Sequence, residues 1–233
     1  MQGRTAYGGA SAALAFEAAR VVAPDLPPLR SAQVAFVGPL GGELAATATL
    51  LRRGRNAAFV GADVVGEAGL GLRACFVFMN DLPSHVDYDD SRAPPAPAPE
   101  DATPADRLSA LPSFIRNFDL AFAQPKDGPR APDLLRWARL RDRGNIHPVT
   151  ELLLIGDALP PAAMNLFERQ GPISSMTWQV NLLGSEPRTR DGWWLIRATA
   201  DYARHGCSSQ AMRVWNADGE AAASGMQSVA LFV

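Results

Sequence analysis

The two halves of this 233-residue chain resemble each other closely enough to indicate an internal duplication. The corresponding pairs are residues 33–38 and 179–184, residues 48–54 and 200–206, and residues 66–78 and 219–232. Two copies of this size indicate a duplicated domain, because a solenoid needs at least three short repeats. We therefore expect a molecule with pseudo-twofold symmetry. One half of such a molecule can retain the catalytic residues while the other half has only a structural role.

The composition is that of a globular protein with at least one substantial core. Hydrophobic residues make up 47% of the chain, and the net charge is −2 with both signs interspersed. This charge pattern argues against nucleic acid or an anionic membrane surface as a partner. We find no secretory signal and no apolar run of transmembrane length, and Cys75 and Cys207 suggest no disulfide framework. The sequence predicts a soluble cytoplasmic protein.

The first half of the chain reads as one helix followed by four strands. Residues 11–22 are rich in alanine and end before a proline, which is typical of a helix. Gly8 and Gly9 just ahead of it allow the backbone to approach closely at the helix start. Four β-rich runs separated by turns that contain glycine follow. They are residues 32–37, 42–51, 57–65 and 70–78.

A proline-rich stretch separates this half from the second. Residues 93–101 alternate alanine and proline, a pattern that holds neither a helix nor a central strand. We predict an N-terminal unit over residues 1–84, a Pro/Ala-rich linker over 85–112 and a C-terminal unit over 113–233. The second unit is expected to contain a helix over residues 151–159. Its expected strands are residues 117–123, 135–141, 174–183, 193–202, 210–215 and 221–233.

Two polar residues in the second unit stand in apolar surroundings. Gln227 shares a strand face with Val229 and Leu231, because side chains alternate along a strand. A buried glutamine without partners costs roughly 1–3 kcal/mol. Asp157 lies in a strongly apolar helical segment, where burial of a lone charge is expensive. We expect the chemistry of this protein near these two residues.

In order and spacing, the motifs of the chain resemble the type II acyl-CoA thioesterases, the double-hotdog family. The residues that carry the resemblance are Gly8-Gly9, Gly38-Pro39, the turn 51–55, the strand 137–142, the Asp-Ala-Leu-Pro-Pro segment 157–161, the hairpin 215–219 and the final run to Gln227. The resemblance implies an α+β fold of two fused hotdog units, each an antiparallel sheet wrapped around a long helix. It also implies hydrolysis of acyl-CoA thioesters to a free acid and coenzyme A, without a bound cofactor or metal.

The resemblance also assigns a catalytic set. In this family an Asp, a Thr or Ser, and a Gln of the second hotdog bind and activate the water that attacks the thioester. These positions correspond to Asp157, Ser175 and Gln227, with Thr177 as the alternative for the hydroxyl. If strict alternation holds, Ser175 and Thr177 lie on one strand face. Backbone N–H groups at the start of either unit's helix are expected to polarise the carbonyl.

Two other functions remain open for the same scaffold. One is a hotdog protein that binds acyl-CoA without turnover, and the other is a hotdog hydratase or dehydratase. The latter usually needs a histidine paired with an acid, and no histidine lies near Asp157 in such a pattern. His85, His147 and His205 also lack the spacing of metal ligands.

The start of the chain and its sheet edges bear on assembly. The family usually has a strand before the Gly-Gly helix, and only seven residues precede Gly8. Either the first unit lacks this edge strand or the sequence lacks its native start. Exposed edges invite pairing, and Trp193, Trp194 and Trp215 add apolar area for an interface. We expect a homodimer.

Overall fold

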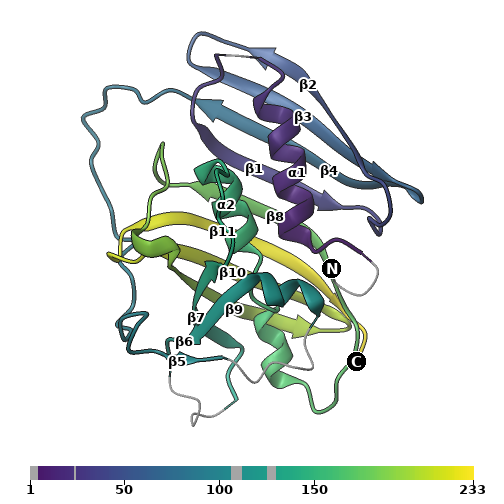
Figure 1. The fold of residues 1–233 in the computed structure, drawn as a ribbon, viewed down its shortest axis with the longest axis vertical. Coiled ribbons are helices and arrows are strands. Elements are labelled where there is room, and N and C mark those ends of the chain that lie inside the picture. Colours follow the sequence, from purple (N-terminus) through teal and green to yellow (C-terminus); the bar gives the residue numbers. More distant parts are fainter. Residues whose placement is uncertain (1–4, 24, 106–111, 125–129) are drawn as a thin grey trace.

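The computed structural model describes residues 5–23, 25–105, 112–124 and 130–233 (Figure 1). Its helices are α1 (Gly8–Arg20) and α2 (Pro148–Gly156), with short 3-10 turns at Ser113–Asn117, Ala162–Leu166 and Arg190–Gly192. Its strands are β1 (Leu29–Phe36), β2 (Ala45–Arg53), β3 (Ala57–Gly66), β4 (Gly69–Met79), β5 (Thr103–Pro104), β6 (Phe118–Phe122), β7 (Asp133–Leu140), β8 (Ile173–Leu182), β9 (Trp194–Arg204), β10 (Cys207–Asn216) and β11 (Ala221–Leu231). The predicted helices and strands correspond to these elements within a few residues at their ends.

All the strands join in one antiparallel sheet with the order β2-β3-β4-β1-β8-β11-β10-β9-β7-β6-β5. The two halves meet where β1 pairs with β8, and Gln33 lies directly opposite Gln179 in that pair. These two glutamines are equivalent residues of the internal repeat. A residue paired with its own counterpart marks a local twofold axis, so the duplication detected in the sequence is the symmetry of the sheet.

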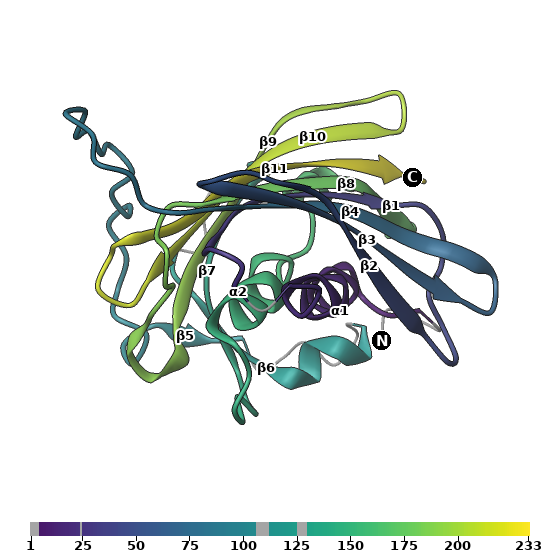
Figure 2. The same cartoon turned by 90° about the horizontal axis from the view of Figure 1, so that it is seen from above.

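Both helices lie on one face of the sheet, side by side (Figure 2). In the first half, Phe16 of α1 packs against Phe76 of β4, with ring centroids 5.8 Å apart. In the second half, α2 is apolar on almost all sides, and Leu153 and Ile155 are fully buried. A helix of this kind is stable only inside a core. Each half is therefore a helix wrapped by antiparallel strands, as predicted for the α+β double-hotdog fold.

The segment between the halves covers the other face of the second half. The indole of Trp137 donates a hydrogen bond to the carbonyl of Pro97 (2.9 Å), and the indole of Trp215 donates to that of Ser91 (2.5 Å). Trp215 and Trp194 are both buried. The expectation that these two tryptophans offer interface area is wrong, because the chain covers them itself. The division of the chain at residues 84 and 113 stays a prediction, and residues 106–111 of the predicted linker lie outside the described residues.

The two halves differ at their outer edges. In the second half, β9 pairs with β10 on one side and with β7 on the other. Its counterpart β2 pairs with β3, and within the described ranges no strand pairs with its outer side. Several β2 side chains are exposed, including Leu50 and Leu51. The described part of the chain holds no helix with the length and apolar character needed to cross a membrane.

Candidate functional site

Asp157 lies where the two halves of the molecule meet. It is the first residue after α2, and its carboxylate reaches the start of α1 in the other half. One carboxylate oxygen, Oδ2, accepts a hydrogen bond from the backbone N–H of Gly9 at 2.8 Å. The other, Oδ1, accepts one from the side-chain amide of Gln227 at 2.6 Å. The two residues predicted to converge, Asp157 and Gln227, are therefore in direct contact.

A second glutamine continues this chain of hydrogen bonds into the core. Gln210 of β10 lies directly opposite Gln227 of β11, and its Nε2 donates to the Gln227 Oε1 at 2.8 Å. The Oε1 of Gln210 in turn accepts from the backbone N–H of Ala162 at 2.9 Å. Gln210 and Gln227 are only 1% and 4% exposed, so neither amide can use bulk water as a partner. Each is satisfied only in the orientation that the chain of bonds gives it.

The direction of these bonds explains why a carboxylate stands at position 157. The chain begins at a backbone donor, Ala162 N–H, and ends at another backbone donor, Gly9 N–H. A side-chain amide accepts a hydrogen bond at its oxygen and donates one at its nitrogen, so it links two neighbours in the series. A series with a donor at both ends must contain one group that accepts from both sides. An ionised carboxylate is such a group, because it only accepts.

Burial raises the pKa of the Asp157 carboxyl to about 6, and the hydrogen bonds from Gln227 and Gly9 oppose this rise. Its surroundings are mixed in charge. The carboxyl lies at the negative end of the α2 dipole and at the positive end of the α1 dipole. With a pKa of about 6, the group is mostly ionised at neutral pH and still has an appreciable affinity for a proton. It has the acidity expected of a general base.

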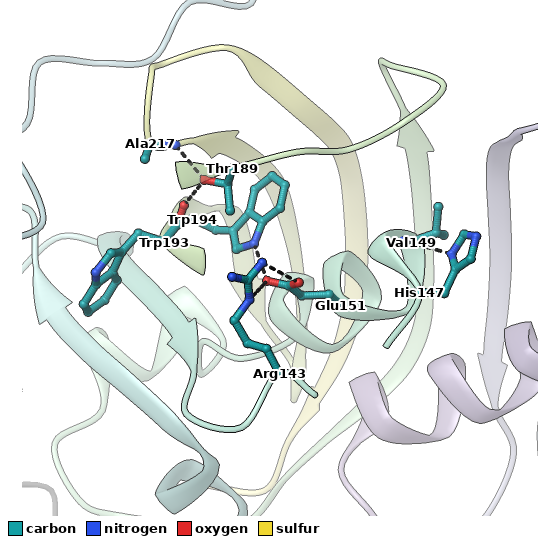
Figure 3. Close-up of polar contacts among 8 residues, drawn as sticks. All are labelled: Arg143, His147, Val149, Glu151, Thr189, Trp193, Trp194 and Ala217. Carbon is teal, nitrogen blue, oxygen red and sulfur yellow. Dashed lines mark hydrogen bonds and ion pairs between the residues drawn. The ribbon is translucent and has the colours of Figure 1, made fainter. Parts of the chain in front are cut away.

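An ion pair between the exposed Arg143 and the buried Glu151 carboxylate holds α2, and hence Asp157, in place (Figure 3). The Glu151 carboxylate of α2 accepts two hydrogen bonds from the Arg143 guanidinium, both at 3.1 Å, and one from the Trp194 indole at 3.2 Å. At the start of the same helix, the His147 imidazole accepts from the Val149 N–H. A buried carboxylate is stable only with such partners. Figure 3 shows Arg143 and Trp194 at the Glu151 carboxylate, and His147 beside Val149 at the start of α2.

A cavity of about 460 Å³ opens in front of the Asp157 carboxyl. Gly8 and Ser11 of α1, Phe36 of β1 and Ser175 of β8 also line it. A Cβ at position 8 would lie 2.6 Å from the Asp157 Oδ2, so only glycine lets α1 approach the carboxylate this closely. The cavity thus joins the N-terminus of one helix, the C-terminus of the other and the strand ends between them.

The two predicted hydroxyl residues lie on opposite faces of the sheet. Thr177 pairs with Ser228 and Ser175 pairs with Val229, so Met176 is an extra residue in β8, a β-bulge. A bulge breaks the alternation of side chains. Ser175 consequently lines the Asp157 cavity, whereas Thr177 lines a hollow on the face turned away from the helices. The expectation that both share a face is wrong.

Two residues of the site were not predicted from the sequence. Gln210 lies on an inward strand face between Ser208 and Met212, the same signal that identified Gln227. Tyr7 precedes α1, donates to the carbonyl of Leu154 at 3.3 Å and stacks on Phe114. Burial, and secondarily the charge of Asp157, raises the pKa of the Tyr7 hydroxyl, which therefore stays protonated. Tyr7 fixes the start of α1 against α2. In the described ranges no group of three or more His, Cys, Asp or Glu side chains could hold a metal ion.

Comparison with protein families matches the two halves of the chain to the two domains of one family. Residues 1–79 match the model of the acyl-CoA thioesterase N-terminal domain, and residues 89–231 match that of the acyl-CoA thioesterase C-terminal domain. No curated protein matched the chain in the corresponding sequence search.

Solved structures share the fold at low sequence identity. A protein of unknown function with a hot dog fold from Alicyclobacillus acidocaldarius has a TM-score of 0.86 at 20% identity, over 99% of this chain and 88% of that one. A tesB protein from Mycobacterium avium subspecies paratuberculosis has a TM-score of 0.81 at 17% identity, over 100% and 90%. Acyl-CoA thioesterase II from Mycobacterium marinum has a TM-score of 0.73 at 18% identity, over 96% and 88%. A dehydratase domain of a polyketide synthase is more distant, with a TM-score of 0.58 at 13% identity over 97% and 90%.

Proposed function

Because the chain belongs to the acyl-CoA thioesterase family, we propose that it hydrolyses acyl-CoA thioesters to a free acid and coenzyme A. The observation that carries this proposal is the Asp157 carboxylate at the cavity, held by the Gln227 amide and the Gly9 N–H. A thioester is already activated towards acyl transfer, so an activated water suffices and no covalent nucleophile is required.

Asp157 is the proposed general base. It takes a proton from a water molecule as the water oxygen bonds to the thioester carbon, and the carbonyl oxygen becomes an oxyanion. When the carbonyl re-forms, the carbon–sulfur bond breaks, and the proton on Asp157 passes to the departing thiolate. The carboxylate is then regenerated, and atoms and protons balance over the cycle. A pKa of about 6 suits both transfers near neutral pH.

Ser175 and Gln227 are the proposed orienting groups for the water. The Gln227 amide fixes the position of the carboxylate, with which it shares a 2.6 Å hydrogen bond, and Ser175 lines the same cavity as the carboxylate. Neither residue moves a proton in the rate-limiting step of this scheme. Their contribution is orientation, which is lost in part when either side chain is shortened.

The N-terminus of α1 is the proposed site of oxyanion stabilisation. Gly8 and Ser11 of its first turn line the cavity, and the N-terminal end of a helix carries a partial positive charge. The start of α2 is an unsuitable alternative, since it lies at the opposite end of that helix from Asp157. Of the two helices considered from sequence, the one in the first half therefore fits this role.

The two alternative functions have less support. A hydratase or dehydratase needs a histidine beside the acid, but His147 lies at the start of α2, opposite Asp157, and His85 and His205 are exposed. A binding protein without turnover does not require a carboxylate at the cavity with a pKa suited to proton transfer near neutral pH.

A thiol-release assay with a panel of acyl-CoA substrates tests the proposal. We expect saturable release of coenzyme A from at least one acyl-CoA, in proportion to the protein added, with the free acid as the second product. Calorimetric binding of the same acyl-CoA without release of thiol would instead identify a binding protein. Release of water from a 3-hydroxyacyl-CoA, with the thioester intact, would identify a dehydratase.

A further inference from the structure

We propose that Trp178 sets the acyl chain length that this site accepts, by closing the inner end of the Asp157 cavity. This inference rests on the proposed function, and it adds to it a substrate class, the short acyl chains. Trp178 belongs to β8, is 2% exposed, and is not part of the set that activates water.

The inward face of β8 connects the residues that line the cavity with those that line an apolar space of the second half. Because Met176 is a bulge, Ser175 and Trp178 are consecutive inward side chains of this strand. Ser175 lines the cavity at its near end. Beyond Trp178, the next inward residues are Val180 and Leu182, which lie beneath α2. An acyl chain that extends from the thioester along this face therefore meets the indole first.

The indole lies directly behind the proposed base. Trp178 is the cross-strand partner of Gln227. Its six-membered ring also lies against Gly156, the residue before Asp157, where a Cβ would be 3.0 Å from Cζ2 and 3.2 Å from Cη2. Glycine at this position allows the ring to lie against the end of α2 and to close the gap between helix and sheet.

The space behind the indole is apolar but nearly full. It is lined mainly by aliphatic side chains, among them Val149, Leu152, Leu153, Val180, Leu182 and Met212. Its free volume is only about 10 Å³, which is no more than one water molecule needs. The aliphatic lining is suited to bind a hydrocarbon chain. While the indole of Trp178 is in place, however, the space is too small to hold an acyl chain.

Stability alone does not account for a tryptophan at this position. Its Nε1 is buried and has no hydrogen-bond partner among the described residues, which costs about 1–3 kcal/mol. A phenylalanine, leucine or methionine at this position would avoid this penalty. The Nε1 and Cζ2 atoms are bonded to the same ring carbon, and Cζ2 lies against Gly156, the residue before Asp157. A size requirement at the cavity explains the choice of the largest side chain.

Chain-length profiles of four variants test this role. The assay measures kcat/KM for butyryl-CoA, octanoyl-CoA and lauroyl-CoA in the full-length protein. Wild type is expected to prefer butyryl-CoA. Trp178→Leu and Trp178→Met open the passage and should raise the lauroyl-to-butyryl ratio about tenfold or more, the discrimination that a few methylenes give in an apolar pocket. Trp178→Phe removes less bulk and should raise the ratio by a smaller factor than Trp178→Leu or Trp178→Met.

Leu182→Ala is the matched control, because it enlarges the same apolar space behind a closed indole. It should leave the ratio unchanged. A protein that releases thiol from no acyl-CoA contradicts the proposed function. An active protein contradicts only the role of Trp178 if wild type prefers lauroyl-CoA, or if Trp178→Leu and Trp178→Met keep the wild-type ratio. Thermal unfolding of each variant identifies those that fold. Trp178→Met serves as the second variant if Trp178→Leu does not fold, because the more flexible methionine side chain adapts better to the core.

Discussion

Replacement of Asp157 by asparagine should change the stability of the protein in a way that depends on pH. An asparagine has one acceptor oxygen, whereas Asp157 accepts from Gly9 on one side and from Gln227 on the other. Reversing both glutamines does not help, because the far end of the chain is the fixed Ala162 N–H. One donor is therefore left facing another donor, which costs about 1–3 kcal/mol relative to an ionised carboxylate that accepts both hydrogen bonds.

The opposing effect comes from the charge that the variant lacks. The Asp157 pKa is raised from 3.8 to about 6 in the folded protein. The folded state thus holds this proton more tightly than the unfolded state does. The stability that the bound proton contributes is complete below the unfolded pKa and is lost as the pH rises through about 6. From pH 4.5 to pH 7, this loss amounts to about 2 kcal/mol for a shift of this size.

Urea unfolding of wild type and Asp157→Asn at pH 4.5 and pH 7 measures the difference. We expect the variant to gain about 2 kcal/mol of stability relative to wild type between pH 4.5, where Asp157 is protonated and neutral like asparagine, and pH 7. Other carboxylates titrate alike in both proteins, so the comparison isolates position 157. A difference in stability that is the same at both pH values, or that changes in the opposite direction, would refute the raised pKa.

Three further predictions concern the site and the assembly. Ser175→Ala should lower kcat, whereas Thr177→Val should leave kcat unchanged because the bulge turns Thr177 to the other face; equal effects in the steady-state assay would refute this. Gln210→Met should lower the free energy of unfolding by about 1–3 kcal/mol, because it leaves the Ala162 N–H unpaired. It should also raise the apparent pKa of the acid limb of activity, because Gln227 no longer holds its hydrogen bond to Asp157; an unchanged limb would mean that Gln210 only packs. Light scattering should give the mass of a homodimer, since the outer edge of β2 is an uncharged strand edge over residues 45–51, and a strict monomer at micromolar concentration would contradict it.

The symmetry and the main site contact could be predicted from the sequence because both depend on strong local signals. The repeat around Gln33 and Gln179 places equivalent residues opposite each other at the sheet centre. Asp157 and Gln227 were found because each stands alone among apolar neighbours. Buried polar groups need partners, so two of them on adjacent elements are expected to meet.

The remaining features depend on the register and on tertiary packing, which alternation alone does not give. The bulge at Met176 separates Ser175 from Thr177, and no residue in that segment marks it. Gln210 carried the same signal as Gln227, but its meaning depends on the pairing of β10 with β11. Trp215 could not be recognised as buried because a coil segment far away in the sequence covers it.

The central claim is that Asp157 activates the water that cleaves an acyl-CoA, and the pH dependence of kcat/KM for wild type and Asp157→Asn tests it most directly. Wild-type activity should fall about tenfold per pH unit below an apparent pKa of about 6. At neutral pH, Asp157→Asn should lose about 10²–10⁴-fold in rate. Asp63→Asn, which alters an exposed carboxylate paired with Arg73 on the opposite face of the sheet, should keep full activity. An Asp157→Asn protein that folds and retains the wild-type rate would contradict the account.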